Sequence, residues 1–331
     1  MIVLACDLGG TNIRFGLGEA GKLARETVRQ FQGDEFSGFE DAARSYLKLV
    51  EVTAVASAVI ALAAPIDGDS VRLTNRDWTI SRKEVATLSG TQSVVLINDF
   101  AALGAALSQR CALDTELMQP GPQGDGVRLV LGSGTGFNAS ALVAGNHVLS
   151  AEIGHTTFAP APGIETELRD HYADAFGRCS HDRVLSGSGL LTLYRLLCAS
   201  SGRRPATEKT SDVTTAAAEA SDDDAVAACR TFAGMLGRTA GDLALTFLPY
   251  GGIYLTGSVT RALRPFIRGG ESAFAQAFFA KGRMQGLMGE FQVNLVRDDT
   301  AALIGCLAWH DLNENHGCGV RATGPKRPVG G

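Results

Sequence analysis

The sequence lacks an excess of charge of one sign. Among its 331 residues, Lys and Arg number 30 and Asp and Glu number 35, which gives a net charge of -5 at neutral pH. Proteins that bind nucleic acid or anionic membranes through charge carry a basic excess. We therefore expect neither nucleic acid nor a membrane as a partner. The ten prolines are also too few for a low-complexity chain.

Paired cysteines and long apolar runs are also missing. The seven cysteines are scattered and none forms a Cys-x-x-Cys pair, which suits a reducing compartment and excludes a zinc knuckle. The longest weakly polar run, residues 52–66, is too short to cross a bilayer as a helix. The apolar segment Ile2 to Cys6 has no basic residue before it and ends at Asp7, unlike a signal peptide. We expect a cytoplasmic protein.

Glycine, in contrast, is abundant: 40 of 331 residues is about 12%, against roughly 7% in average proteins. Two Gly-rich turns, Asp7–Thr11 and Gly132–Gly136, each lie between two predicted strands. Backbone N–H groups of such turns can wrap a phosphate. Neither turn matches the P-loop pattern or the dinucleotide-binding pattern. Ordinary hairpin turns also use glycine, so each turn alone leaves that alternative open.

The other segments alternate between strand and helix patterns, which is typical of the α/β class. Ser37–Glu40 and Ser81–Glu84 have the Ser-x-x-Glu spacing of a capping box, and each predicts the start of a helix. Further expected strands are 57–62, 94–97, 127–131, 138–143, 253–256 and 293–296. Further expected helices are 165–176, 189–200, 223–248, 271–279 and 300–311, followed by a loose tail.

Six motifs in a fixed order carry a family resemblance. Asp7-Leu-Gly-Gly-Thr-Asn-Ile-Arg14 resembles the first phosphate loop of the actin-like sugar kinases. Leu131–Gly136 resembles their second phosphate loop, and Gly251–Gly257 resembles the turn that holds adenosine. The remaining motifs are Leu96-Ile-Asn-Asp-Phe100, Ala151-Glu-Ile-Gly-His155 and Val184-Leu-Ser-Gly187. From residue 1 to about residue 311, the chain resembles the bacterial glucokinases of the hexokinase superfamily.

The resemblance implies a fold and a reaction. The fold has two actin-like, ribonuclease-H-like α/β domains flanking a substrate cleft. Residues 1–109 with 298–312 would form the small domain, residues 110–297 the large nucleotide-binding domain, and residues 313–331 a flexible tail. The implied reaction is the ATP-dependent, magnesium-dependent phosphorylation of glucose at the 6-hydroxyl.

Asp99 is the expected general base. It follows a predicted strand, so its carboxylate would lie at a strand end, where open α/β sheets place ligands. An aspartate of ordinary pKa, about 3.9, can accept the hydroxyl proton late in the transition state. From the residues alone, the alternative is that Asn98 and Asp99 only cap the helix that follows. The family motif favours the catalytic interpretation.

The resemblance assigns the other site residues. The sugar contacts would be Asn75, Asn98, Asp99, Glu152, His155 and Asp182; the nucleotide contacts would be Asp7, Gly9, Gly10, Thr11, Asn12, Gly134, Thr135 and Gly257. Asp7 would also hold Mg²⁺ through water. No zinc is expected, because no cysteine cluster follows Glu152 and His155.

The sequence departs from the family in three segments, at four residues. Asp182 stands where the family has Glu, Phe137-Asn138 where small residues or glycine are common, and Ser258 where a second glycine is usual. Fold alone does not select the sugar, so a kinase of another hexose or an amino sugar is an alternative. A non-catalytic sugar sensor and an actin-like assembly ATPase are further alternatives. The sequence does not fix the oligomeric state, and a homodimer is left open.

Overall fold

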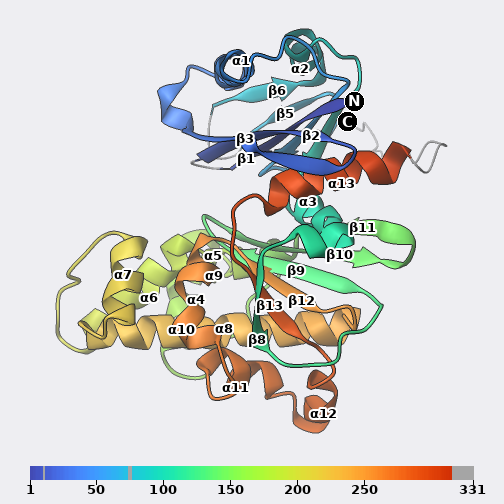
Figure 1. The fold of residues 1–331 in the computed structure, drawn as a ribbon. Helices are drawn as coiled ribbons and strands as arrows, with labels where there is room; N and C mark the ends of the chain where they lie inside the picture. The colour runs from blue at the N-terminus through green and yellow to red at the C-terminus, as the bar shows by residue number, and fades with distance from the viewer. Residues whose placement is uncertain (10–11, 74–76, 315–331) are drawn as a thin grey trace, which may run out of the picture.

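The computed structural model describes residues 1–9, 12–73 and 77–314, which form a mixed α/β fold around two main sheets (Figure 1). The N-terminal sheet has the order β3-β2-β1-β4-β7: Lys22–Gln32, Asn12–Glu19, Ile2–Leu8, Ser57–Leu62 and Val94–Asn98. The second sheet has the order β11-β10-β9-β12-β13-β8: His147–Ser150, Phe137–Val143, Arg128–Ser133, Ile253–Thr256, Val293–Val296 and Thr115–Gln119. A small ribbon pairs β5 (Ser70–Arg72) with β6 (Thr79–Ser81).

The two sheets repeat one arrangement. In the first, β1 pairs antiparallel with β2 and parallel with β4, which is parallel to β7. In the second, β9 pairs antiparallel with β10 and parallel with β12. Each sheet therefore contains a Gly-rich hairpin beside parallel strands whose carboxyl ends meet at one edge. The prediction that each of the two Gly-rich turns lies between two strands is confirmed.

Helices cover both faces of the N-terminal sheet, which explains why its central strands are apolar throughout. Leu4 and Cys6 of β1 face a core that includes residues of α1 (Phe39–Leu49) and α2 (Arg82–Ser89). Val3 and Ala5 face the other side, toward α3 (Asp99–Ala106) and α13 (Ala301–Glu314). Figure 1 shows α3 and α13 lying between the two sheets.

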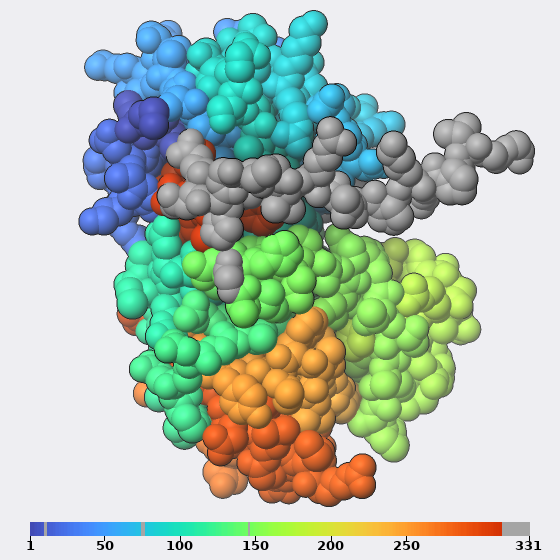
Figure 2. All heavy atoms as spheres, turned by 90° about the vertical axis from the view of Figure 1, so that its right-hand side faces the viewer, coloured from blue at the N-terminus to red at the C-terminus, as the bar shows by residue number. Residues whose placement is uncertain are grey.

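The contact between α3 and α13 is close because of one glycine. A Cβ at Gly305 of α13 would collide with the carbonyl oxygen of Ala102 in α3. The final helix thus packs against the N-terminal sheet although it comes last in the chain. Figure 2 shows α13, in red, between the blue-to-cyan part and the green-to-orange part.

The second sheet packs against a helical layer built around the long α8 (Asp223–Phe247), whose apolar face joins the largest core of the molecule. The other helices of this part are α4 (Ile164–Phe176), α5 (His181–Val184), α6 (Gly187–Ser200), α7 (Thr210–Ala218), α9 (Ser258–Ala262), α10 (Arg264–Ile267), α11 (Ala273–Phe279) and α12 (Gln285–Met288). Single 3-10 turns occur at 33–35, 107–112, 144–146, 153–155 and 282–284. Among the described helices, none has the length and apolar character needed to cross a membrane.

Two sequence predictions about helix ends are corrected. Ser37 does not cap α1: its hydroxyl and its N–H both bond to the Asp41 carboxylate, and Gly38 is the N-cap residue. The final helix, which the sequence predicted to end at residue 311, extends to Glu314. Residues 315–331 lie outside the described part of the chain, and the proposed domain boundaries stay a prediction.

Candidate active site

Asp7 and Asp99 lie at the same edge of the N-terminal sheet. Asp7 is in register with Ala61 of β4, which is in register with Ile97 of β7, and Asp99 follows that strand by one residue. Neighbouring strands are about 4.8 Å apart and β4 lies between β1 and β7, so the two residues are about 10 Å apart along this edge and belong to one strand-end cluster. Asp7 is only 9% exposed, and Asp99 is half-buried.

The contacts of Asn98 are those of a helix N-cap, the alternative that the sequence left open. Its Oδ1 accepts hydrogen bonds from the backbone N–H groups of Phe100 (2.9 Å) and Ala101 (3.3 Å) at the start of α3. Its Nδ2 donates to the carbonyl of Ala64 at 3.4 Å. Asp99 is the first residue of the helix and also accepts from the Phe100 N–H, at 2.9 Å. Asn98 thereby fixes the start of the helix that carries Asp99.

The electrostatics of Asp99 are unusual for an aspartate. Burial of the carboxyl and the charge of Asp7 raise the pKa of Asp99 to about 7, with Glu152 adding to the rise and the Phe100 N–H opposing it. A carboxyl with a pKa near neutrality has the protonation behaviour of a general base or acid. The same interaction shows that Asp7, Asp99 and Glu152 share one electrostatic environment.

Asp7 takes part in a chain of ion pairs that the sequence analysis missed. Arg14 of β2 lies 3.2 Å from the Asp7 carboxylate and 3.2 Å from that of Asp299. Asp299, just before α13, also pairs with Arg261 of α9. The chain therefore connects the first Gly turn with the second sheet's helical layer. Burial raises the pKa of Asp7, and Arg14 opposes that rise.

The second Gly turn and Gly257 lie together at the carboxyl ends of β9 and β12. Thr256 is in register with Gly132, and a Cβ at Gly257 would collide with the Ser133 backbone. Close packing thus already requires glycine at position 257, where φ is +97°. Gly134 is held by the N–H of Gly187, which donates to its carbonyl at 2.9 Å. Thr135 is exposed.

This turn has features that fit a phosphate. A Cβ at Gly134 would make only ordinary van der Waals contact, with the Oγ of Ser258 at 3.6 Å, so no described residue crowds the backbone there. The buried Oγ of Ser133 has no hydrogen-bond partner among the described residues. Buried polar atoms without a partner are rare and indicate a missing water or ligand atom.

Glu152, His155 and Asp182 meet beside the start of β10. Asp182 is half-buried, and its Oδ1 accepts from the Phe137 N–H at 2.8 Å. Gly154 packs so tightly on Phe137 that a Cβ there would overlap the Phe137 carbonyl. Glu152 and His155 are exposed on this turn. Partial burial raises the pKa of Glu152, which His155 opposes and Asp182 reinforces.

The remaining predicted site residues are placed differently. The Asn12 Oδ1 accepts hydrogen bonds from the side chains of Gln30 and Gln32, so the Asn12 side chain links β2 to the neighbouring strand β3. Gly9 closes a tight turn by donating its N–H to the Asn12 carbonyl at 3.1 Å. Gly10, Thr11 and Asn75 lie outside the described residues.

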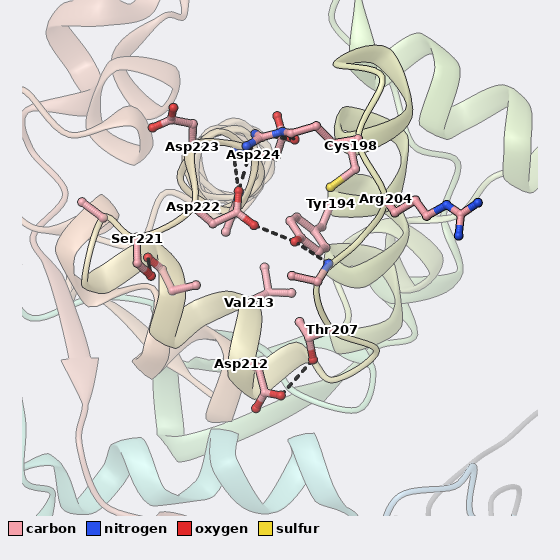
Figure 3. Close-up of a pocket in the computed structure, with 15 residues that line it drawn as sticks. Tyr194, Cys198, Arg204, Thr207, Asp212, Val213, Ser221, Asp222, Asp223 and Asp224 are labelled. Carbon is pink, nitrogen blue, oxygen red and sulfur yellow. Dashed lines mark hydrogen bonds and ion pairs between the residues drawn. The ribbon is translucent and has the colours of Figure 1, made fainter.

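A cavity of about 750 Å³ lies away from this site, between α6, α7 and the start of α8 (Figure 3). Its polar groups pair with one another: the Tyr194 hydroxyl donates to Asp222 at 2.6 Å, and Thr207 donates to Asp212 at 2.8 Å. None of the predicted site residues lines it. The cavity therefore does not compete with the strand-end cluster as the active site.

Comparison with known proteins identifies the family of the chain. The family model described as "Glucokinase" matches residues 4–313. A glucokinase of Chromobacterium violaceum is 37% identical over 308 residues, which cover 91% of this chain and 87% of that protein.

Solved structures give the same result for the fold. A glucokinase from an Antarctic psychrotroph has a TM-score of 0.75 and 30% identity, covering 94% of this chain and 99% of that one. A ROK family glucokinase from Streptomyces griseus, solved in complex with glucose and AMPPNP, has a TM-score of 0.64 at 19% identity, covering 93% of this chain and 99% of that one. The two-sheet α/β architecture is thus the actin-like fold of the sugar kinases, as the sequence predicted.

Proposed function

The chain belongs to the glucokinase family, and from this premise we propose that it transfers the γ-phosphoryl group of ATP to the 6-hydroxyl of glucose, with Asp99 as general base. The observation that carries the role of Asp99 is its position: a half-buried carboxyl at a strand end, near enough to Asp7 and Glu152 for their charges to raise its pKa. The product is glucose 6-phosphate, which enters glycolysis.

The reaction needs a held hydroxyl, an acceptor for its proton and stabilisation of the phosphoryl charge. Asp99 accepts the proton of the 6-hydroxyl as the new P–O bond forms and the bond to the ADP oxygen breaks. Asn98 keeps the start of α3 fixed, so the Asp99 carboxylate does not have to reorganise during the step. Glu152, His155 and Asp182 bind the sugar hydroxyls at the anomeric end.

Backbone N–H groups of the two Gly turns bind the phosphates of the nucleotide. No described residue crowds the Gly134 backbone, so this turn can approach a phosphate closely, and Gly9 forms the matching turn from the other sheet. The S. griseus relative was solved with AMPPNP, which supports ATP as the phosphoryl donor. Thr135 and Gly257 complete this side of the site.

Asp7 fits a water-mediated Mg²⁺ site. It is a buried carboxylate beside the first Gly turn, with one ion pair to Arg14. Mg²⁺ commonly uses one or two carboxylates together with phosphate oxygens and waters. When bound there, Mg²⁺ would neutralise part of the phosphate charge. The homodimer and the cytoplasmic location stay predictions.

The pH dependence of the reaction follows from Asp99. Its native pKa of about 7 lies above that of an ordinary aspartate, and only the ionised form accepts a proton. We expect kcat/KM for glucose to fall about tenfold per pH unit well below pH 7 and to level off above pH 8. Steady-state rates between pH 5.5 and 9 would measure this. A flat profile down to pH 5.5 would contradict the assignment of Asp99.

The sugar is tested by ADP release on a panel of glucose, mannose, fructose, N-acetylglucosamine, 1,5-anhydroglucitol and no sugar. We expect the highest kcat/KM for glucose and little turnover without sugar. If the enzyme turns over N-acetylglucosamine or mannose faster than glucose, that sugar is the substrate and the assignment of glucose is wrong. No sugar-dependent turnover of any member would favour the non-catalytic sensor.

The same panel tests Asp182. One of its oxygens already accepts the Phe137 N–H, which leaves the other to bind the anomeric hydroxyl. The sugar without this hydroxyl, 1,5-anhydroglucitol, should lose about fivefold to a hundredfold in kcat/KM, because an unpaired polar group costs about 1–3 kcal/mol. Equal kcat/KM for the two sugars would move anomeric recognition to Glu152 and His155.

A further inference from the structure

Asn138 is a buried polar residue in a strand, a setting in which Asn is uncommon. Both ends of its carboxamide are used. Its Nδ2 donates to the Ala151 carbonyl at 2.9 Å and to Glu152 Oε2 at 3.4 Å. Its Oδ1 accepts from the N–H groups of Ala139 at 2.9 Å and Gly154 at 3.4 Å. One side chain therefore holds the turn that carries Glu152.

Phe137, the residue before Asn138, also contacts a side chain assigned to sugar binding. The Phe137 N–H holds the Asp182 carboxylate, so two successive residues of β10 contact two of the three side chains assigned to the anomeric end of the sugar. These residues directly follow the Gly134–Gly136 turn. The start of β10 thus links the nucleotide turn with the sugar side of the site.

Glu152 needs such a support. Its side chain is exposed, and a free glutamate loses rotamer freedom when it binds a ligand. A contact that fixes its backbone turn and orients its carboxylate before the sugar arrives reduces that loss. Asn138 makes both contacts: two bonds to the backbone of the turn, at Ala151 and Gly154, and one to the Glu152 carboxylate.

We propose that Asn138 is a positioning residue for the sugar: its carboxamide fixes the 151–154 turn and orients Glu152 for the hydroxyls at the anomeric end of glucose. The inference rests on the proposed function, because it requires Glu152 to bind the sugar. It concerns a position at which the family commonly has glycine or a small residue.

The test compares Asn138→Ala with a matched control, Ser140→Ala. Ser140 lies two residues further along β10 on the same face, is also buried, and donates its hydroxyl to the Leu149 carbonyl of the next strand at 3.0 Å. No hydrogen bond described for Ser140 reaches Glu152. Asn138→Asp serves as a second variant: it keeps the acceptor for Gly154 and loses the donor to Ala151 and Glu152.

We expect both Asn138 variants to raise the KM for glucose about three- to tenfold, the net effect of about one hydrogen bond, because only the orientation of Glu152 acts on the sugar. In Asn138→Asp, repulsion between the new carboxylate and that of Glu152 adds to the loss of the donor. The KM for ATP should stay within about twofold, and Ser140→Ala should change neither constant. Glu152→Gln should also raise the KM for glucose. Because Asn138 acts through Glu152, Asn138→Ala combined with Glu152→Gln should be less than additive in free energy.

The possible results distinguish a failure of the inference about Asn138 from a failure of the proposed function. If Glu152→Gln raises the KM for glucose while both Asn138 variants behave as Ser140→Ala does, the inference is wrong and the function stands. If Glu152→Gln leaves the KM for glucose unchanged, the sugar-binding role of Glu152 fails, and the inference fails with it. Full additivity in the double variant would also overturn the inference.

Discussion

Replacing Asp99 by Asn should lower kcat for glucose by about 10²–10⁴, the usual effect of losing a general base. The amide cannot accept the hydroxyl proton, but its oxygen can still accept the Phe100 N–H bond made by the carboxylate. Glucose binding, measured by titration calorimetry, should therefore change little. Turnover within a few-fold of the wild type would show that another group takes the proton.

A second measurement separates lost chemistry from lost folding. The native pKa of Asp99 is raised above that of an unfolded aspartate, so the native carboxyl carries a charge at pH 8 in an environment that disfavours it. Asn removes this cost, and the variant should melt above the wild type at pH 8. The gap should narrow as the pH falls through 7 toward 4, where Asp99 of the wild type becomes protonated.

A matched control is Asp69→Asn, which makes the same change of charge on a side chain that is 94% exposed. It should leave kcat unchanged. An inactive Asp99→Asn protein that melts at a higher temperature than the wild type would exclude misfolding as the cause of its inactivity.

The sequence predicted best those elements in which local pattern and tertiary burial agree. The strands at 253–256 and 293–296 are found with the predicted bounds, because both are short apolar runs buried in the second sheet. The capping box at Ser81 is confirmed by the bond from the Glu84 N–H to the Ser81 hydroxyl. The box at Ser37 has the same spacing, but Asp41 competes for the serine.

Elements without a clear apolar pattern were missed. The long β3 lies at the sheet edge and is only partly buried, so its charged residues conceal the strand. The short α7 is rich in Thr and Ala, with few buried positions. Neither segment has the periodicity on which a sequence-based prediction depends.

The sequence also predicted only part of the site. Strand-end placement of Asp7 and Asp99 could be predicted, since each follows an apolar strand. The ion pairs that join Arg14, Asp299 and Arg261 could not, because they connect segments far apart in the chain. Asn138 was visible only as a departure from the family, and its contacts with the Glu152 turn follow from the pairing of β10 and β11.

Gly134 offers the clearest test of the nucleotide site, because a side chain there has room in the protein itself. An added Cβ would make ordinary contact with Ser258, 3.6 Å from its Oγ and 3.8 Å from its N. Its backbone is also outside the left-handed region that only glycine adopts easily. Gly134→Val should therefore fold, unlike a change at Gly257, whose Cβ would collide with the Ser133 backbone.

If a phosphate lies against the Gly134 backbone, the branched side chain keeps it away. We expect Gly134→Val to raise the KM for ATP at least about tenfold, or about 1.4 kcal/mol, and to leave glucose binding unchanged, with Gly134→Ala intermediate. Gly38→Val is the control, since a Cβ there meets nothing within 4 Å and its φ of -177° is extended. Unchanged ATP kinetics in a folded Gly134→Val protein would mean that this turn is an ordinary hairpin, and the phosphates would then have to be held by the first Gly turn and Arg14 alone.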